Sequence, residues 1–215
     1  MNPKDILSRI DHTCLKPFAT HTDIKKLCEE AVELGTASVC IPPCFVDYAF
    51  QQFGDRLTIC TVIGFPLGYQ CTEVKLLETA KALRDGAAEI DMVINVGDAK
   101  EGNFKKITEE IRSLKNLVGG DRVLKVIVET CYLTAEEKVA LCRCVSEAGA
   151  DYIKTSTGFG PQGAVLEDIT LFKEHIAPQV KIKAAGGIKT LEDMERFIDL
   201  GSDRIGSSSA AAIFS

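Results

Sequence analysis

The chain has 215 residues, 46% of them hydrophobic and 26% charged, which is the composition of an ordinary globular protein. Its net charge of −6 argues against a broad nucleic-acid-binding surface. The polar start, residues 1–5, is unlike a signal peptide, and no run of about 18 apolar residues predicts a membrane span. We therefore expect a cytoplasmic protein that binds neither nucleic acid nor membrane.

Short β-branched runs recur along the chain and alternate with helical patterns. The expected strands are residues 10–13, 37–41, 57–63, 89–95, 123–129, 152–156, 180–184 and 204–206. Apolar side chains repeat near the helical period in residues 23–34, 72–84 and 104–117. Residues 134–137 and 190–193 resemble capping boxes, and helix ends are expected near Gly35, Gly86, Gly149 and Gly201.

Strands that alternate with helices predict a parallel sheet, which is either an open doubly wound sheet or a closed barrel. Eight strand–helix units favour an α/β fold of the (β/α)8 barrel type, because open sheets usually have five or six strands. No linker or composition break divides the chain, so residues 1–215 are expected to form one domain. Residues 207–215 leave little room for a final helix.

Two lysines stand late in neighbouring predicted strands, each just before glycine. Lys154 lies in the run Asp-Tyr-Ile-Lys-Thr-Ser-Thr-Gly of residues 151–158, and Lys183 in Lys-Ile-Lys-Ala-Ala-Gly-Gly of residues 181–187. Lysine is costly to bury and is poorly suited to a strand interior. Each alone is explained by a surface charge or a salt bridge. Together, at the carboxyl ends of adjacent barrel strands, they predict a site of amine chemistry.

A lysine amine is a nucleophile only when it is neutral, and about 0.04% of a free lysine is neutral at pH 7. A neighbouring cation and partial desolvation both disfavour the charged form, so one lysine can activate the other for imine formation. Asp91 lies inside another apolar strand, where it is either a lysine counter-ion or a proton shuttle. Asp11, Lys125 and Glu129 are expected to complete a hydrogen-bond network.

Glycines and serines follow three of these strands. In barrels, the loops after the seventh and eighth strands often bind phosphate through backbone N–H groups. Glycine lets the backbone approach a ligand, serine adds donors and Lys189 adds charge. The expected phosphate-binding residues are Gly158, Gly186, Gly187, Lys189, Gly206, Ser208 and Ser209.

Nine cysteines without a signal peptide are expected to be reduced thiols, most of them buried as small apolar side chains. The pairs Cys40–Cys44 and Cys142–Cys144 have poor spacing for zinc, and the three histidines are scattered. The sequence predicts no metal site.

Motifs in residues 11–13, 39–43, 62–68, 89–95, 124–130, 150–159, 183–187 and 206–209 together resemble the deoxyribose-phosphate aldolase family. The resemblance runs in the family's order from about Asp11 to the end of the chain, and the run around Lys154 is its most specific part. Lys189 departs from the arginine common in the family, which removes the planar fork that binds phosphate. Pro42 also replaces a polar or aromatic residue.

The resemblance implies a class I aldolase that needs no metal or cofactor. It would cleave 2-deoxy-D-ribose 5-phosphate reversibly into D-glyceraldehyde 3-phosphate and acetaldehyde. Lys154 matches the Schiff-base lysine, Lys183 the second lysine and Asp91 the proton-relaying acid, while the glycine and serine loops match the phosphate site. A homodimer is also implied. The alternatives are another Schiff-base barrel enzyme, of the transaldolase or dehydratase type, and a non-catalytic barrel that binds phosphorylated metabolites.

Overall fold

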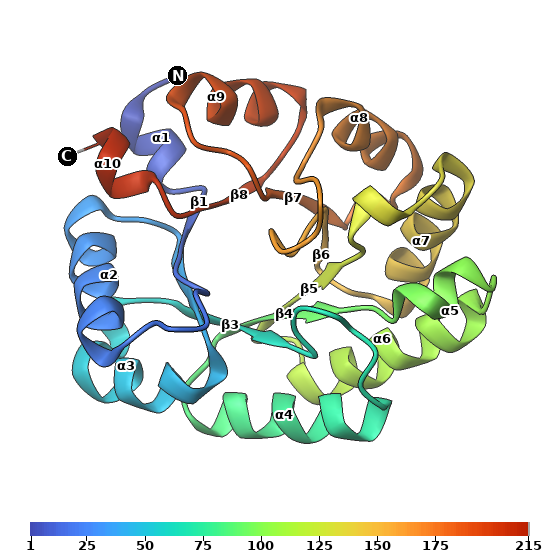
Figure 1. Ribbon diagram of the computed structural model, residues 1–215, viewed down its shortest axis with the longest axis horizontal. Coiled ribbons are helices and arrows are strands. Elements are labelled where there is room, and N and C mark those ends of the chain that lie inside the picture. The colour runs from blue at the N-terminus through green and yellow to red at the C-terminus, as the bar shows by residue number, and fades with distance from the viewer. Residues whose placement is uncertain (215) are drawn as a thin grey trace.

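The structure, a computed structural model, describes residues 1–214 (Figure 1). Eight parallel strands pair in chain order, and β8 pairs with β1, so the sheet closes into a barrel. This confirms the (β/α)8 prediction and excludes the open sheet. The strands are β1 Ile10–Thr13, β2 Ser38–Ile41, β3 Ile59–Ile63, β4 Glu89–Val93, β5 Val123–Ile127, β6 Tyr152–Lys154, β7 Lys181–Ala185 and β8 Arg204–Ser207.

Helices surround the barrel as an outer ring (Figure 1). They are α1 Pro3–Leu7, α2 His21–Leu34, α3 Val46–Phe53, α4 Thr72–Arg84, α5 Val96–Lys100, α6 Phe104–Val118, α7 Ala135–Ala148, α8 Leu166–His175, α9 Leu191–Leu200 and α10 Ala210–Phe214. Three short 3₁₀ turns lie at Pro43–Phe45, Gly54–Arg56 and Thr130–Tyr132. Within residues 1–214, no helix combines the length and apolar character that crossing a membrane requires.

Local sequence signals explain most helix ends. Thr134 and Glu137 form the predicted reciprocal capping box of α7, and the Thr190 side chain accepts from the backbone of Asp193 at the start of α9. Gly35 and Gly149 take left-handed conformations that end α2 and α7.

Several strands end earlier at their carboxyl ends than the sequence predicted. The expected strand 89–95 ends at Val93, because the Asn95 side chain caps α5 by accepting from Gly97 and Asp98. The expected strand 123–129 ends at Ile127, and Glu129 is left-handed. The expected strand 152–156 ends at Lys154. Residues beyond these strand ends therefore form loops at the carboxyl rim of the barrel.

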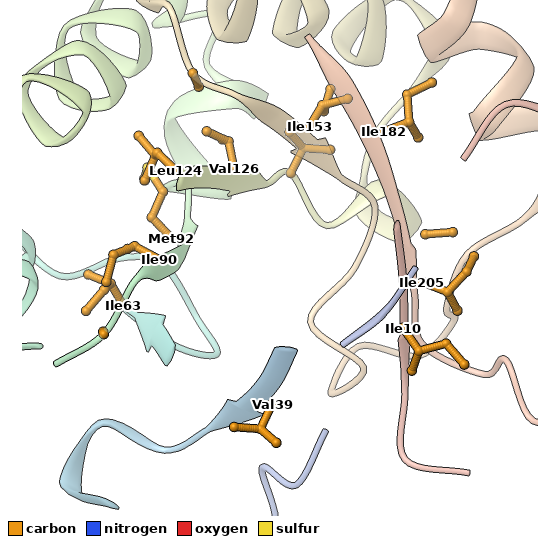
Figure 2. Packing of buried hydrophobic residues seen from close by; sticks show 14 of the residues in the cluster. Ile10, Val39, Ile63, Ile90, Met92, Leu124, Val126, Ile153, Ile182 and Ile205 are labelled. Carbon is orange, nitrogen blue, oxygen red and sulfur yellow. The ribbon is translucent and has the colours of Figure 1, made fainter. Parts of the chain in front are cut away.

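The apolar core lies between the barrel and the helices. Successive side chains of a strand point to opposite faces, and the outward ones, such as Ile90 and Met92 of β4 or Leu124 and Val126 of β5, are fully buried in this layer (Figure 2). The inward residue between Ile90 and Met92 is Asp91, which bonds to Lys183 across the barrel. At this level the lumen thus holds an ion pair where a barrel usually has branched apolar side chains.

Candidate active site

Lys154 and Lys183 meet at one carboxylate inside the barrel. They are Cα partners on the neighbouring strands β6 and β7, which confirms the predicted adjacency. Their side chains are almost entirely buried, with 3% and 0% of the residue exposed. Both Nζ atoms donate to Asp91 Oδ2, from 2.7 Å and 2.6 Å respectively. Asp91 thus contacts both lysines, a position that suits either of its expected roles, counter-ion or proton shuttle.

The contacts of Asp91 extend into a larger network. Lys125 of β5 donates to Asp91 Oδ1 at 2.9 Å and lies 2.5 Å from Glu89 Oε2. Asp11 of β1 accepts from Lys183 and, at 2.5 Å, from Arg204 of β8. Asp11 and Lys125 thus join the network as the sequence predicted, whereas Glu129, expected with them, bonds to Thr157 instead.

The buried charges of this network do not balance when every group is ionised. Four cations face three carboxylates, and the members are Lys125, Lys154, Lys183 and Arg204 against Asp11, Glu89 and Asp91. Unbalanced charge in a low-dielectric interior is costly. The loss of one proton from one lysine would leave three charges of each sign.

The network fixes the charge state of several of its members. Burial alone would raise the pKa of Asp91, but the charges of Lys125, Lys154 and Lys183 hold it well below its usual range. Burial alone would lower the pKa of Lys183, but Asp11 and Asp91 raise it above its ordinary value. The pKa of Lys125 is likewise raised, against burial, by its acidic neighbours. Lys183 and Lys125 are therefore held as cations.

A pocket of about 370 Å³ opens at the carboxyl rim, above Lys154. Within residues 1–214, Lys154 is the one buried lysine that lines it, since Lys16 and Lys189 at its walls are exposed. The pocket brings together most of the predicted phosphate residues, namely Gly158, Gly186, Gly187, Lys189, Gly206 and Ser208. Ser209 does not line it. Ser207, two residues earlier, does line it, and its Oγ accepts from the backbone N–H of Ser209.

The glycine loops are packed against each other. Gly186 has φ +85°, a conformation that other residues rarely adopt. A Cβ added to Gly163 would lie 2.1 Å from the carbonyl oxygen of Gly186. The loop after β6 therefore approaches the loop after β7 as closely as glycine allows.

Comparison with known proteins agrees with this geometry. Residues 6–212 match the family model described as DeoC/LacD family aldolase. The chain belongs to the DeoC/LacD aldolase family. It is 60% identical over 213 residues to the deoxyribose-phosphate aldolase of Clostridium botulinum strain Alaska E43, covering 99% of this chain and 96% of that protein. It is 52% identical to the deoxyribose-phosphate aldolase of Clostridioides difficile strain 630, covering 98% and 95%.

Solved aldolase structures share the fold along nearly the whole chain. The aldolase QR15 superposes with a TM-score of 0.92 at 41% identity, covering 97% of this chain and 94% of that one. The tetrameric deoxyribose phosphate aldolase of Aeropyrum pernix superposes with a TM-score of 0.89 at 32% identity, covering 98% and 90%. This family member is accordingly an enzyme of the carbon–carbon lyase class.

Sequence reasoning missed several residues of this aldolase site. Arg204 and Glu89 anchor the network, and Lys16 and Phe159 line the pocket. Arg204 and Glu89 each begin a strand and alternate with apolar neighbours. This alternation could have predicted that their side chains point into the barrel. Lys16 follows β1 in an exposed loop and carries no signal of its own.

Two groups of three side chains could in principle supply metal ligands, Cys40–Cys60–Asp91 and Asp11–Cys60–Glu89. Their donors are already engaged, because Cys60 donates to Asp91 at 3.2 Å and lies 3.3 Å from Lys125 Nζ. Buried ammonium groups around the carboxylates disfavour a further cation. These side chains are better suited to an ion network than to a metal.

Proposed function

We propose that the chain is a class I deoxyribose-phosphate aldolase. It would cleave 2-deoxy-D-ribose 5-phosphate reversibly into D-glyceraldehyde 3-phosphate and acetaldehyde through a Schiff base on Lys154. One observation carries the proposal: Lys154 is the buried lysine that faces the pocket, and it shares Asp91 with a second lysine held as a cation. The activity named for the clostridial relatives supports the same substrate.

In the synthetic direction, neutral Lys154 adds to the carbonyl carbon of acetaldehyde, and the carbinolamine takes up a proton on its oxygen and loses water, which gives an iminium ion. The iminium acidifies the methyl carbon, a base removes one proton, and the C–H electrons form an enamine. The enamine carbon then attacks the aldehyde carbon of glyceraldehyde 3-phosphate, whose oxygen takes up a proton. Water hydrolyses the new iminium, which releases the sugar phosphate and regenerates the Lys154 amine.

Asp91 and Lys183 have different roles in stabilising charge and transferring protons. Lys183 stays charged between Asp11 and Asp91, so it disfavours an ammonium on Lys154 and can donate to the carbinolamine oxygen. Asp91 stays a carboxylate, so it stabilises the cationic iminium. Once the neutral enamine forms, Asp91 loses one cationic neighbour and becomes a better proton acceptor. We assign it, with a water molecule, the relay of the methyl proton.

The phosphate would bind at the rim, where Lys189 supplies charge and the loops after β6, β7 and β8 present backbone. Gly158, Gly187 and Ser208 line the pocket, and their N–H groups donate to no acceptor of the protein within the described residues. Such N–H groups bind anions well. Because the phosphate binds at the rim and not at the Lys154 amine, it orients the substrate rather than activating it. Nine free thiols in the structure support the cytoplasm as the compartment.

Incubation with deoxyribose 5-phosphate, with and without borohydride, tests the proposal. We expect turnover to acetaldehyde and, after reduction, a covalent adduct on Lys154 identified by peptide mass spectrometry. Turnover of another sugar phosphate in place of this one would indicate the transaldolase or dehydratase type. Binding of deoxyribose 5-phosphate with neither turnover nor adduct would indicate a non-catalytic barrel.

Replacing Lys183 with methionine should shift the pH profile of turnover. Three carboxylates would then face Lys125, Lys154 and Arg204, so charge balance would favour a proton on Lys154. We expect kcat at pH 7 to fall by about 10²-fold, and the rising limb of the kcat–pH profile to move to higher pH. The control is Lys181→Met, an exposed lysine two residues earlier on β7. A profile that keeps its position would contradict the assignment of Lys183.

Replacing Gly163 with alanine should weaken binding of the phosphorylated substrate. The new Cβ would push the Gly186 carbonyl away and move the loop that carries Gly187. Moving this phosphate-binding loop is expected to raise the KM for the phosphorylated substrate by about tenfold to a hundredfold, as steady-state kinetics would show. Gly120→Ala is a matched control, because nothing lies within 4 Å of its added Cβ. An unchanged KM in Gly163→Ala would separate this loop from substrate binding.

A further inference from the structure

Glu129, just after β5, has an unusual backbone and a buried side chain. Its φ of 56° and ψ of 65° are left-handed, and it is the one non-glycine residue with positive φ within residues 1–214. Glutamate rarely adopts this conformation, because its Cβ crowds the backbone. Only 4% of the residue is exposed. A strained and buried carboxylate beside a functional pocket calls for a local cause.

The Glu129 carboxylate binds one residue of the loop after β6. Its Oε1 accepts from the Thr157 backbone N–H at 3.1 Å, and its Oε2 accepts from the Thr157 hydroxyl. Thr157 Oγ1 in turn accepts from the Phe159 backbone N–H at 3.0 Å. Both donors of Thr157 and the N–H of Phe159 are thereby turned into the protein. The intervening Gly158 N–H is left without a protein acceptor among the described residues.

The left-handed backbone places Glu129 where it can make these bonds. Val128 N donates to Lys154 O at 3.0 Å, and Thr130 N donates to Thr155 O at 2.9 Å. Two residues on the β5 side therefore correspond to one on the β6 side, as in a β-bulge. The extra residue is Glu129, and its side chain is turned toward Thr157. The segments after β5 and β6 are thus fastened together directly beyond Lys154.

We propose that Glu129 is a positioning residue that sets the shape of the loop Thr157–Phe159 so that this loop binds the substrate phosphate. The inference rests on the proposed aldolase function and deepens it. A carboxylate suits the task because it only accepts, and its two oxygens match the two donors of Thr157. Glu129 lies behind the loop and does not line the pocket, whereas Thr157, Gly158 and Phe159 do. It acts through the loop and touches neither the substrate nor Lys154.

The test compares two substrates that differ only by the phosphate. In Glu129→Gln, one oxygen that accepts from Thr157 becomes an NH₂ donor, so one of the two bonds is lost. We expect kcat/KM to fall at least about tenfold more for 2-deoxyribose 5-phosphate than for 2-deoxyribose, mainly through KM, since a charge-assisted hydrogen bond is worth about one decade. Thr157→Val, which removes the same hydroxyl bond from the other side, should show the same selective loss. Glu174→Gln, an exposed carboxylate of α8, is the matched control.

A second readout does not depend on turnover. The dissociation constant of inorganic phosphate, measured by calorimetry on folded protein, should rise about tenfold in Glu129→Gln and Thr157→Val but not in Glu174→Gln. If the wild-type chain does not turn over 2-deoxyribose 5-phosphate, but Glu129→Gln and Thr157→Val still bind phosphate more weakly than the wild type, the role of Glu129 stands and the aldolase function is overturned. Unchanged phosphate affinity in the first two variants, or equal losses for the two sugars, would overturn the role of Glu129.

Discussion

Replacing Lys154 with leucine is expected to abolish turnover of 2-deoxyribose 5-phosphate, with kcat lowered by at least about 10⁴-fold. Leucine has no amine to form the imine, and neither of the other two lysines of the network can replace it. Lys183 and Lys125 are held as cations by their carboxylates, and neither lines the pocket. The loss should appear in kcat, while binding of the phosphate group persists.

A second variant at this position separates chemistry from charge. Lys154→Arg keeps a cation beside Asp91 but presents a guanidinium, which does not lose its proton at neutral pH, so it should be equally inactive and folded. Lys105→Leu, an exposed lysine of α6, is the control and should retain activity. The measurements are steady-state kinetics, borohydride trapping and circular dichroism. Appreciable turnover in either Lys154 variant would remove Lys154 from the reaction.

The parts of the fold that were predictable are those that local patterns determine. The apolar repeat of residues 23–34 matches α2, and Ile24, Leu27 and Ala31 of that repeat are buried, because a helix turns every fourth residue to the same face. In residues 72–84 the repeat predicted the helix α4 but not its buried face, since Val74 and Leu77 are exposed. Asp91 was correctly placed inside a strand, and its alternation with Ile90 and Met92 puts it on the opposite face, since successive strand residues point to opposite faces. The neighbourhood of Lys154 and Lys183 followed from chain order, because consecutive units of a barrel are neighbours.

The unpredictable parts depend on contacts between distant segments. Arg204 reaches Asp11 and Glu89 across the lumen, and no spacing rule links positions in β8, β1 and β4. Ser207 lines the pocket in place of the predicted Ser209. Which serine does so depends on where β8 ends, and strand ends are poorly defined by sequence. The bulge at Glu129 follows from pairing with β6 rather than from its own residue type, which disfavours a left-handed backbone.

Replacing Asp91 with asparagine should lower both stability and activity. The carboxylate is shared by Lys125, Lys154 and Lys183, so its loss leaves the four cations of the network with two carboxylates. Breaking a buried ion network in this way costs about 3–5 kcal/mol. Turnover of the folded fraction should also fall by about 10²-fold or more, because the proton relay is lost. Asp121→Asn, an exposed residue before β5, is the control.

The stability loss has a charge signature that distinguishes it from a packing defect. In the double variant Asp91→Asn with Lys154→Met, three cations face two carboxylates, so part of the lost free energy of unfolding should return while activity does not. A packing defect would give no such recovery. Urea unfolding of the single and double variants measures both quantities. Additive destabilisation by the two substitutions would contradict the charge argument.

The pH dependence of stability provides an independent check. The network holds the pKa of Asp91 and of Asp11 below the value of about 3.9 for an unfolded aspartate. Their contribution to the free energy of unfolding is therefore fully present above about pH 5 and is lost as the pH falls further, since the unfolded chain then binds protons that the folded chain does not. In Asp91→Asn one of these two terms disappears, so urea midpoints should decline less steeply between pH 5 and about pH 3 than in the wild type. Equal slopes in the two proteins would mean that Asp91 is not the buried anion on which the lysine network depends.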